Sequence, residues 1–297
     1  MTMPVLHDNR GMWNPGVPAM SDDLLLASAD ALAERVPDGA QVVLPRDHSG
    51  TPMELVRALV RRGVRDLRLV GVTGVGLSVD MLIGAGAVAE LEAPGVSLGE
   101  FGPARRFTHA IKTGAIRMKD STCPAMHAEL QAAEKGVPFM PLRGIIGSDL
   151  LRVRDDWIVI DNPFGEDDPI VLLPAVTPDV AIFHASMVDD HGNVWIGRRH
   201  ELKTLAHAAR GSLVTAERRY EGDLLEDERY AAGTVPALYL DAVAIAEGGA
   251  WPCAFWDRYP ADAAHMREYA EAARTEEGFR DYVARHVLGT AAGVAAE

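Results

Sequence analysis

The fold is decided by the stretch LRLVGVTGVGLSVDMLIG, which occupies residues 67–84. Its apolar start, 67–70, predicts a buried strand, and 71–76 predicts a glycine-rich loop. The following apolar segment predicts a helix that begins near Ser78 and ends at Gly84. A strand, a loop and a helix therefore follow one another within eighteen residues.

The preceding segment has the same order. Residues 42–44 predict a short buried strand, and a polar loop, 45–51, comes next. Pro52 predicts the start of a helix, where its missing N–H does no harm, and Gly63 predicts the end. Because alternating strands and helices are typical of parallel βαβ units, we expect an α/β protein with an open, mostly parallel sheet and flanking helices.

Later segments continue this pattern. Residues 188–193 predict a hairpin-like turn, and charged helical sequence fills 262–288. Further strands are predicted at 138–141, 170–173, 180–183, 194–196, 213–215 and 242–245.

The N-terminal region divides into an arm and a first helix. Residues 1–20, rich in Pro, Gly and Asn, predict a loose arm. Ser21 predicts the N-cap of a helix whose apolar residues keep helical spacing as far as Val36. We expect residues 21–297 to form a single domain.

Composition excludes several classes of protein. The net charge is −14 and no basic stripe occurs, which argues against a nucleic-acid binder. No run of 18 apolar residues predicts a membrane span, and the N-terminus lacks the order of a signal peptide. Cys123 and Cys253 are too far apart to indicate a disulfide scaffold or a zinc site, so we expect a cytoplasmic protein. An acidic chain can bind an anionic substrate only where local positively charged groups reverse the negative electrostatic potential.

Two loops that follow predicted strands are candidate ligand sites, because ligands bind at the carboxyl ends of parallel strands. One is 46–51, where a His–Asp neighbour pair could act as a base; the alternative is a helix N-cap. The other is 71–76, whose spacing is not that of a dinucleotide fingerprint; the alternative is a tight turn. The residues of interest are Arg46, His48, Ser49, Gly50 and Thr51 in the first loop, and Gly71, Thr73, Gly74 and Gly76 in the second.

A third glycine-rich loop, 96–102, contains Ser97, Gly99 and Glu100, with Arg105 and Arg106 close behind. A carboxylate beside two arginines could be a nucleophile, or it could form a surface salt bridge.

Other common catalytic patterns do not occur. There is no nucleophile elbow, P-loop or zinc-protease motif, and the ten histidines show no metal-ligand spacing, so no metal is expected. We interpret His184 as a packed residue and Cys123 as an inert thiol.

Several motifs, in a common order from about residue 24 to 288, resemble family I CoA-transferase α subunits of the glutaconate CoA-transferase kind. The motifs are DVAIFHA at 179–185 with DHGNV at 190–194, DMLIGAG at 80–86, DNPF at 161–164, DAV at 241–243, GGAWP at 248–252 and RRF at 105–107.

The resemblance implies a CoA-transferase-like fold and an α₂β₂ assembly with a β-type partner. In such an assembly, a glutamate of the partner would attack an acyl-CoA and form a glutamyl-CoA thioester, so this chain would act only with its partner. Coenzyme A thioester would be a substrate, and no tightly bound cofactor is expected. The other substrate would be a dicarboxylic or oxo acid held by Ser97, Gly99 and Arg106. The cleft loops would contribute Ser49, Gly50, Gly71, Thr73, Gly74 and Gly76.

Two departures keep alternatives open. The family has a Gly-Gly-Phe turn after the first strand, whereas residues 44–47 here are LPRD. A related pair of subunits opens a steroid ring as a CoA thioester, but the acidic residue of its α subunit is missing in DSTCP at 120–124. The alternatives are therefore such a ring-opening hydrolase subunit, or a non-catalytic ligand-binding relative.

Overall fold

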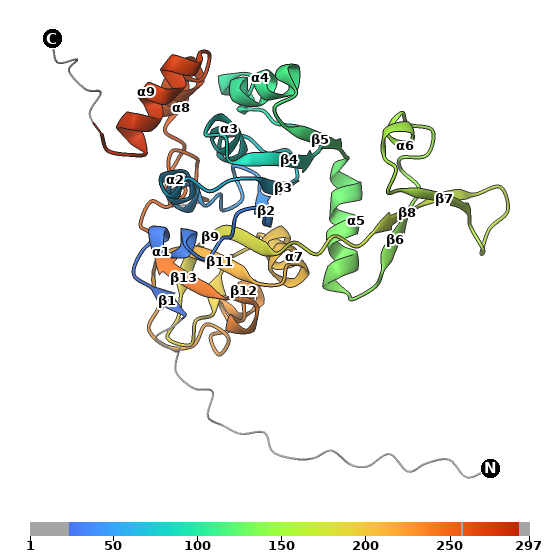
Figure 1. The fold of residues 1–297 in the computed structure, drawn as a ribbon. Coiled ribbons are helices and arrows are strands. Elements are labelled where there is room, and N and C mark those ends of the chain that lie inside the picture. Colours follow the sequence, from blue (N-terminus) through green and yellow to red (C-terminus); the bar gives the residue numbers. More distant parts are fainter. Residues whose placement is uncertain (1–23, 257, 291–297) are drawn as a thin grey trace.

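A large sheet forms the centre of the protein in the computed structural model, which describes residues 24–256 and 258–290 (Figure 1). The strands of its main path are β1 (Leu25–Leu26), β2 (Gln41–Pro45), β3 (Leu67–Val72), β4 (Val88–Ala93), β5 (Arg117–Asp120), β9 (Val180–Val188), β11 (Ser212–Arg219) and β13 (Ala242–Ile245). Their order is β1-β13-β11-β9-β2-β3-β4-β5, and all these neighbours pair in parallel. The predicted open, mostly parallel sheet is therefore confirmed.

The chain reverses its direction of travel across the sheet beside β2. From β2 it proceeds through β3 and β4 to β5, and it later returns to place β9 on the other side of β2. Two short strands, β10 (Val194–Trp195) and β12 (Thr234–Val235), extend this sheet in antiparallel fashion beside β9. The boundary between β2 and β9 is a topological switch point, where open α/β sheets bind ligands.

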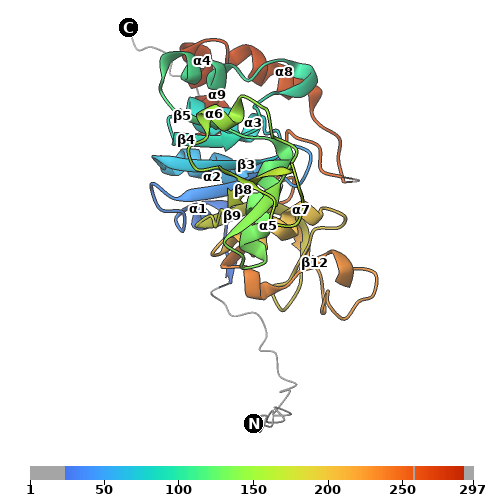
Figure 2. The same ribbon diagram turned by 90° about the vertical axis from the view of Figure 1, so that its right-hand side faces the viewer.

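Helices cover both faces of the large sheet (Figure 2). The helices are α1 (Ala29–Ala33), α2 (Met53–Arg62), α3 (Leu77–Gly84), α4 (Arg105–Thr113), α5 (Cys123–Glu134), α6 (Leu150–Val153), α7 (His200–Ala208), α8 (Ala263–Ala272) and α9 (Glu276–His286), with short 3₁₀ turns η1 (Gly99–Phe101), η2 (Ala231–Gly233) and η3 (Ala237–Tyr239). None of the helices in the described residues is long and apolar enough to cross a membrane.

The alternating directions of the side chains along β2 explain why helices form a layer on each face of the sheet. Val42 and Leu44 are buried in the cluster that contains Leu59 of α2, whereas Val43 is buried with Met126 of α5 and Leu205 of α7. Because successive strand residues point to opposite faces, a continuously apolar strand must be covered on both sides. The helices α1–α3 therefore pack on one face, and α5 and α7 pack on the other.

The predicted helix from Ser21 to Val36 is wrong in its first part. Leu25 and Leu26 form strand β1, whose partners are Val243 and Ala244 of β13. Helix α1 begins only after Ser28, whose hydroxyl accepts a hydrogen bond from the Ala31 amide. A distant edge strand is available to pair with these leucines, and this contact overrides their helical spacing. Ser21 and the predicted arm lie outside the described residues.

Other element predictions are confirmed, with shifted ends. The predicted strands at 42–44, 67–70, 180–183, 213–215 and 242–245 fall in the large sheet, and the turn at 188–193 connects β9 to β10. Helix α2 begins one residue after Pro52, and Gly63, whose φ of 72° is left-handed, caps its end. The predicted helical segment 262–288 contains two helices, α8 and α9, rather than one.

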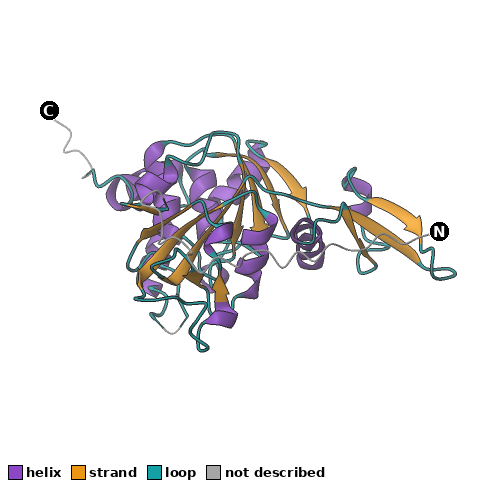
Figure 3. Cartoon of the chain, turned by 90° about the horizontal axis from the view of Figure 1, so that it is seen from below, coloured by secondary structure: helices purple, strands orange, loops and turns teal. Residues whose placement is uncertain are grey.

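A small antiparallel sheet projects from the main body (Figure 3). Its strands are β6 (Phe139–Leu142), β8 (Pro169–Pro174) and β7 (Ile158–Asp161), in that order. It packs on α5 through the buried residues Ala125, Ala128, Trp157, Val171 and Leu173.

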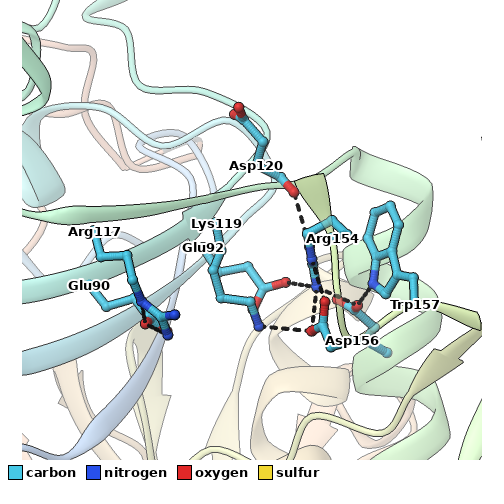
Figure 4. Close-up of polar contacts among 9 residues, drawn as sticks. Glu90, Glu92, Arg117, Lys119, Asp120, Arg154, Asp156 and Trp157 are labelled. Atoms are coloured by element: carbon cyan, nitrogen blue, oxygen red, sulfur yellow. Dashed lines mark hydrogen bonds and ion pairs between the residues drawn. The ribbon is translucent and has the colours of Figure 1, made fainter. Parts of the chain in front are cut away.

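A buried ion network joins this projection to the edge of the large sheet (Figure 4). Arg154 contacts Glu92 of β4 at 2.8 Å and Glu129 of α5 at 3.3 Å. The Trp157 indole donates a 2.8 Å hydrogen bond to Glu129, and Arg154 Nε donates one of 2.8 Å to Asp156. Burial, followed by the nearby charge of Glu92, raises the pKa of Glu129 to about 7.

Candidate active-site cleft

A cavity of about 670 Å³ lies at the carboxyl ends of β2, β3 and β4. We call it the large cavity, to distinguish it from a small pocket beside it. Each of the three glycine-bearing loops predicted from the sequence contributes to its wall. The lining residues include Arg46, Asp47 and His48 from the first loop, Gly74, Val75 and Gly76 from the second, and Ser97, Leu98, Gly99, Glu100 and Phe101 from the third. The loops are brought together because the strands before them are parallel neighbours.

Asp47 connects the first two loops. Its carboxylate accepts a 2.6 Å hydrogen bond from the amide of Leu77, the first residue of α3, and the side chain is buried. Burial raises the pKa of Asp47, although the Leu77 hydrogen bond opposes this shift. A Cβ atom at Gly76 would clash with the Asp47 carboxylate and the Ser97 carbonyl. Gly76 is therefore needed for close approach of the loops.

Ser97 lies on the exposed wall of the cavity. Its amide donates a 2.9 Å hydrogen bond to the Val75 carbonyl, which ties the third loop to the second. Its hydroxyl oxygen accepts a 3.1 Å hydrogen bond from the Gly99 amide. This bond uses the oxygen as acceptor, so the hydroxyl proton can be donated to a carboxylate in the cavity.

Glu100 lies on the same loop and is exposed. It belongs to the 3₁₀ turn η1, and the neighbouring Phe101 ring lies 6.0 Å from the Arg267 guanidinium carbon. Its position on the rim lets it reach the cavity and solvent alike.

Three predicted cleft residues face the interior instead. The Ser49 hydroxyl donates a 2.5 Å hydrogen bond to Glu201 of α7, and a Cβ at Gly50 would clash with the carbonyl of His184. A Cβ at Gly71 would meet the Val75 side chain at 2.7 Å. These residues set the packing of the loops, and they do not line the large cavity in the described residues.

Thr73 faces a small pocket of about 220 Å³. Arg46 lines both this pocket and the large cavity, and Glu201 and His127 complete the small one. This pocket lies where β2 and β3 end and α7 begins, so it continues the large cavity toward the switch point.

Arg106 does not lie where its predicted contact with substrate requires. It is buried in α4, pairs with Glu276 of α9 and places its guanidinium carbon 5.4 Å from the centre of the Phe279 ring. Neighbouring Phe107 donates a 2.8 Å amide hydrogen bond to buried Asp80. Burial raises the pKa of Asp80 to about 6. Arg106 therefore holds α4 against α9, away from the cavity.

A second cavity, of about 790 Å³, was not predicted from the sequence. Its charged and aromatic lining consists of Arg198, Arg199, His200, Arg229, Trp195 and Trp256. These residues come from the β10–α7 connection, the segment before η2 and the segment after β13. We call this group the arginine–tryptophan pocket.

The arginine–tryptophan pocket has a defined wall. The ring of Trp256 stacks on the ring of Phe255, with centroids 4.3 Å apart. The rings of Trp195 and Trp256 pack edge to face, with centroids 6.1 Å apart. Arg199 lies 5.7 Å from the Trp256 ring centre, and Arg229 pairs with Asp227 at 2.6 Å. Among the described residues the lining contains three arginines and no carboxylate, and of the three arginines Arg229 is paired with Asp227 outside the lining.

A buried polar group lies on the strands β9 and β11. His184 shares a 2.8 Å hydrogen bond with Thr215 and contacts Glu217 at 2.7 Å. Glu217 also accepts hydrogen bonds from the Tyr259 hydroxyl and the Gly248 amide, at 2.7 and 3.0 Å. Burial lowers the pKa of His184. Burial acts to raise the pKa of Glu217, but the hydrogen bonds that it accepts outweigh this and lower the pKa to about 2. The group fixes the segment that begins at Gly248, and this agrees with the interpretation of His184 as a packed residue.

The chain that forms this fold and cleft matches one protein family. Residues 26–246 match the family model described as Coenzyme A transferase. The chain belongs to the Coenzyme A transferase family. Its predicted resemblance to that family is thereby confirmed.

Individual relatives divide between transfer and hydrolysis. The A-type subunit of glutaconate CoA-transferase from Acidaminococcus fermentans is 29% identical over 273 residues, which cover 84% of this chain and 83% of that protein. A cholesterol ring-cleaving hydrolase subunit of Rhodococcus jostii is 30% identical over 256 residues, covering 80% of this chain and 83% of that protein. This Coenzyme A transferase family member is therefore similar to subunits of enzymes with two different reactions.

A further relative is longer. An uncharacterized protein of Archaeoglobus fulgidus is 30% identical over 273 residues, and the match covers 90% of this chain but 60% of that protein. The present family member thus spans less than two thirds of the archaeal relative.

The crystal structure of glutaconate coenzyme A-transferase from Acidaminococcus fermentans has the same fold. The TM-score is 0.83 at 27% identity, and the match covers 89% of each chain. The chain is therefore similar in sequence to the A-type subunit of glutaconate CoA-transferase, and it shares the fold found in the crystal structure of that enzyme.

Proposed function

We propose that the chain is the A-type component of a heteromeric acyl-CoA:carboxylate CoA-transferase. It would move CoA between a donor acyl-CoA and a small dicarboxylic or oxo acid. The observation that carries this proposal is that three hollows adjoin one another through shared or neighbouring lining residues. The large cavity and the small pocket share Arg46, and the small pocket contains Glu201, the neighbour of His200 in the arginine–tryptophan pocket.

The arginine–tryptophan pocket suits the nucleotide end of a CoA thioester. Guanidinium groups bind phosphate oxygens through paired, charge-assisted hydrogen bonds. Trp256 and Trp195 offer aromatic surface for a planar base. Arg198 and Arg199 have no carboxylate partner among the described residues, so they are available to an anion. They supply the local positive field that a chain of net charge −14 needs for an anionic ligand.

The acyl end is proposed to occupy the large cavity. There the Ser97 hydroxyl donates to the carboxylate of the acid, and the exposed backbone around Gly99 and Gly74 borders the substrate. The placement of the acidic groups supports a nucleophile on the partner. Asp47 is occupied by its bond to Leu77, and Glu100 is exposed to solvent. A glutamate of a β-type partner would attack the thioester carbonyl, which forms an anhydride and releases CoA thiolate. The thiolate would then attack the glutamyl carbonyl of the anhydride, breaking its C–O bond, releasing the donor acid as a carboxylate and leaving a glutamyl-CoA thioester. The acceptor acid would take up CoA by the same two steps in reverse.

A second function is ring-opening hydrolysis of a CoA thioester. It is favoured by the similarity to the cholesterol ring-cleaving hydrolase subunit, which is as high in identity as that to the transferase subunit. In this alternative, water breaks a carbon–carbon bond of the ring. Its hydroxyl group becomes part of a new carboxyl group, and its proton goes to the carbon that leaves. No enzyme–CoA thioester is formed on the partner, so the two reactions differ in a detectable intermediate.

The test is to co-express the chain with a β-type partner from the adjacent reading frame and to screen CoA thioesters with carboxylic acid acceptors. We expect exchange of CoA by the complex and no exchange by the isolated chain. Exchange by the isolated chain would contradict the proposed division of labour. Hydrolytic ring opening without exchange would select the alternative.

Two matched arginine variants test the placement of CoA. Arg199→Ala should raise the KM for acyl-CoA about tenfold or more, since a hydrogen bond to a charged group contributes ~1.5–3 kcal/mol. Arg210→Ala removes the same charge from an exposed pair with Asp179 and should leave that KM unchanged. Equal effects of the two variants would show that only the net charge matters.

A further inference from the structure

The C-terminal helices α8 and α9 bring together three side chains that are ordinary metal ligands. His265 and Glu268 lie one turn apart on α8, and His286 is the last residue of α9. His286 Nε2 lies 2.8 Å from Glu268 Oε1, and His265 Nδ1 lies 3.6 Å from Glu268 Oε2. One ligand atom from each of the three residues lies within 4.8 Å of the others.

The second ring nitrogen of His265 is already held by a partner. Nε2 lies 2.7 Å from the hydroxyl of Tyr282, which is itself buried. When Nε2–H donates to that oxygen, the lone pair of Nδ1 points to Glu268. Metal-binding histidines in proteins are usually oriented in this way by a hydrogen bond from the other ring nitrogen.

We propose that His265, Glu268 and His286 bind a divalent transition-metal ion, with zinc the best match to two imidazoles and one carboxylate. Nitrogen-rich sets of this kind favour zinc, cobalt or nickel over magnesium and calcium, which prefer oxygen ligands. Glu268 and His286 are part-exposed, so solvent can supply the remaining ligand. The histidines are far apart in sequence, which is why their spacing does not reveal the set.

Binding at this position would fix one wall of the cleft. Met266 follows His265 directly and lines the large cavity, as does Ala261 in the segment that leads into α8. A metal that joins α8 to α9 would hold this wall in place. The site is therefore proposed as structural, and no step of catalysis passes through it.

One arginine contacts the group directly, and a second lies behind the neighbouring Trp251 ring. Arg285 donates a 2.9 Å hydrogen bond to Glu268, and Arg57 lies 5.6 Å from the Trp251 ring, which contacts His265. Arg285 is 46% exposed, and exposed ion pairs are weak, so a divalent cation can displace it from Glu268. Arg285→Ala should consequently tighten metal binding several-fold.

The experiment uses the untagged full chain after treatment with a chelator. It is titrated with Co²⁺, followed by visible absorption, and with Zn²⁺ in competition with a chromophoric chelator. We expect one equivalent of Co²⁺ with the intense bands of a four-coordinate site. His286→Ala should weaken Zn²⁺ binding tenfold or more. His109→Ala, which removes an exposed histidine of α4, is the matched control and should bind as the parent does.

Two further variants distinguish a loss of metal binding from a loss of folding. Tyr282→Phe keeps the ring and removes the hydroxyl, so it should weaken binding by about 10- to 100-fold as other losses of an orienting hydrogen bond do. Arg285→Ala should do the opposite. Absence of stoichiometric binding by the parent chain, or binding that is unchanged in both His286→Ala and Arg285→Ala, would overturn the proposal.

Discussion

The Asp47 carboxylate occupies the space beside Gly76 and accepts a hydrogen bond from the next amide, that of Leu77. A side chain from the loop after β2 thus satisfies an amide at the start of the helix after β3. The N-cap position itself is a glycine, which has no side chain to do this. One contact therefore both caps α3 and holds two walls of the cleft together.

Replacing Gly76 with alanine should destabilise the protein, whereas Gly74→Ala should have little effect. The new Cβ at position 76 would overlap Asp47 and the Ser97 carbonyl, but a Cβ at position 74 meets nothing within 4 Å. Overpacking of this kind costs ~1–3 kcal/mol. Denaturant unfolding of both variants measures the difference. Equal stability of the two would show that the loops separate easily.

The sequence predicts the sheet well because the central strands are apolar on both faces and are bounded by glycine and proline. The same reasoning misses β1, whose two leucines become a strand only by pairing with β13. It also misses β4 and β5. The segment of β4 contains Glu90 and Glu92, and β5 is Arg-Met-Lys-Asp, so local composition conceals these strands.

The candidate cleft is predicted in part. Loops that directly follow neighbouring parallel strands must meet at one edge, so Gly74 and Gly76 are found from the order of strand, loop and helix. Ser97 is reached only through the resemblance to the family, because the strand before it, β4, is not predicted. Arg106 is misplaced because its orientation depends on Glu276, far along the chain. The arginine–tryptophan pocket is missed for the same reason, since its members come from three separate segments.

The two cysteines should differ sharply in reactivity. Both line the large cavity, but Cys123 is exposed at the start of α5 and Cys253 is buried. Burial also raises the pKa of the Cys253 thiol well above its usual range, which disfavours the reactive thiolate. Iodoacetamide should therefore label Cys123 in the native chain and spare Cys253, as peptide mass spectrometry can determine. Cys123→Ser should abolish native labelling, and preferential labelling of Cys253 would mean that the cavity wall opens.

The raised pKa values of Glu129 and Asp80 should add stability as the pH falls from 8 to about 5, whereas buried His184, whose pKa is lowered, removes stability over the same range. The pKa of Glu129 is about 7 in the fold, against 4.5 for an ordinary glutamate, so the folded chain takes up a proton first. Stability is then gained as the pH falls through 7, and the gain is complete below 4.5. Asp80, with a pKa of about 6, acts in the same direction. Glu217, with a pKa of about 2, acts oppositely and removes stability below pH 4.5.

Glu129→Gln isolates the contribution of Glu129. The amide cannot titrate, so as the pH falls from 8 to 5 the unfolding free energy of the variant should change by a less positive amount than that of the parent. Glu228→Gln, at an exposed position, should keep the parent profile. Urea unfolding at several pH values provides the measurement. A parent profile retained in Glu129→Gln would show that Glu129 is already charged in the fold.

Ser97 and Glu100 separate two interpretations of the cleft in the assembled complex. Ser97→Ala removes a donor to the acid carboxylate, and a hydrogen bond to a charged group contributes ~1.5–3 kcal/mol. The KM for the acid should therefore rise about tenfold or more, since ~1.4 kcal/mol is a factor of ten. The variant should still form an enzyme–CoA intermediate, because the hydroxyl takes no part in the attack.

Glu100→Ala should change activity little if the nucleophile is on the partner. Borohydride reduction of the intermediate, followed by peptide mapping, locates the labelled carboxylate. A label at Glu100 would place the nucleophile on this chain and reverse the proposed roles of the two polypeptides.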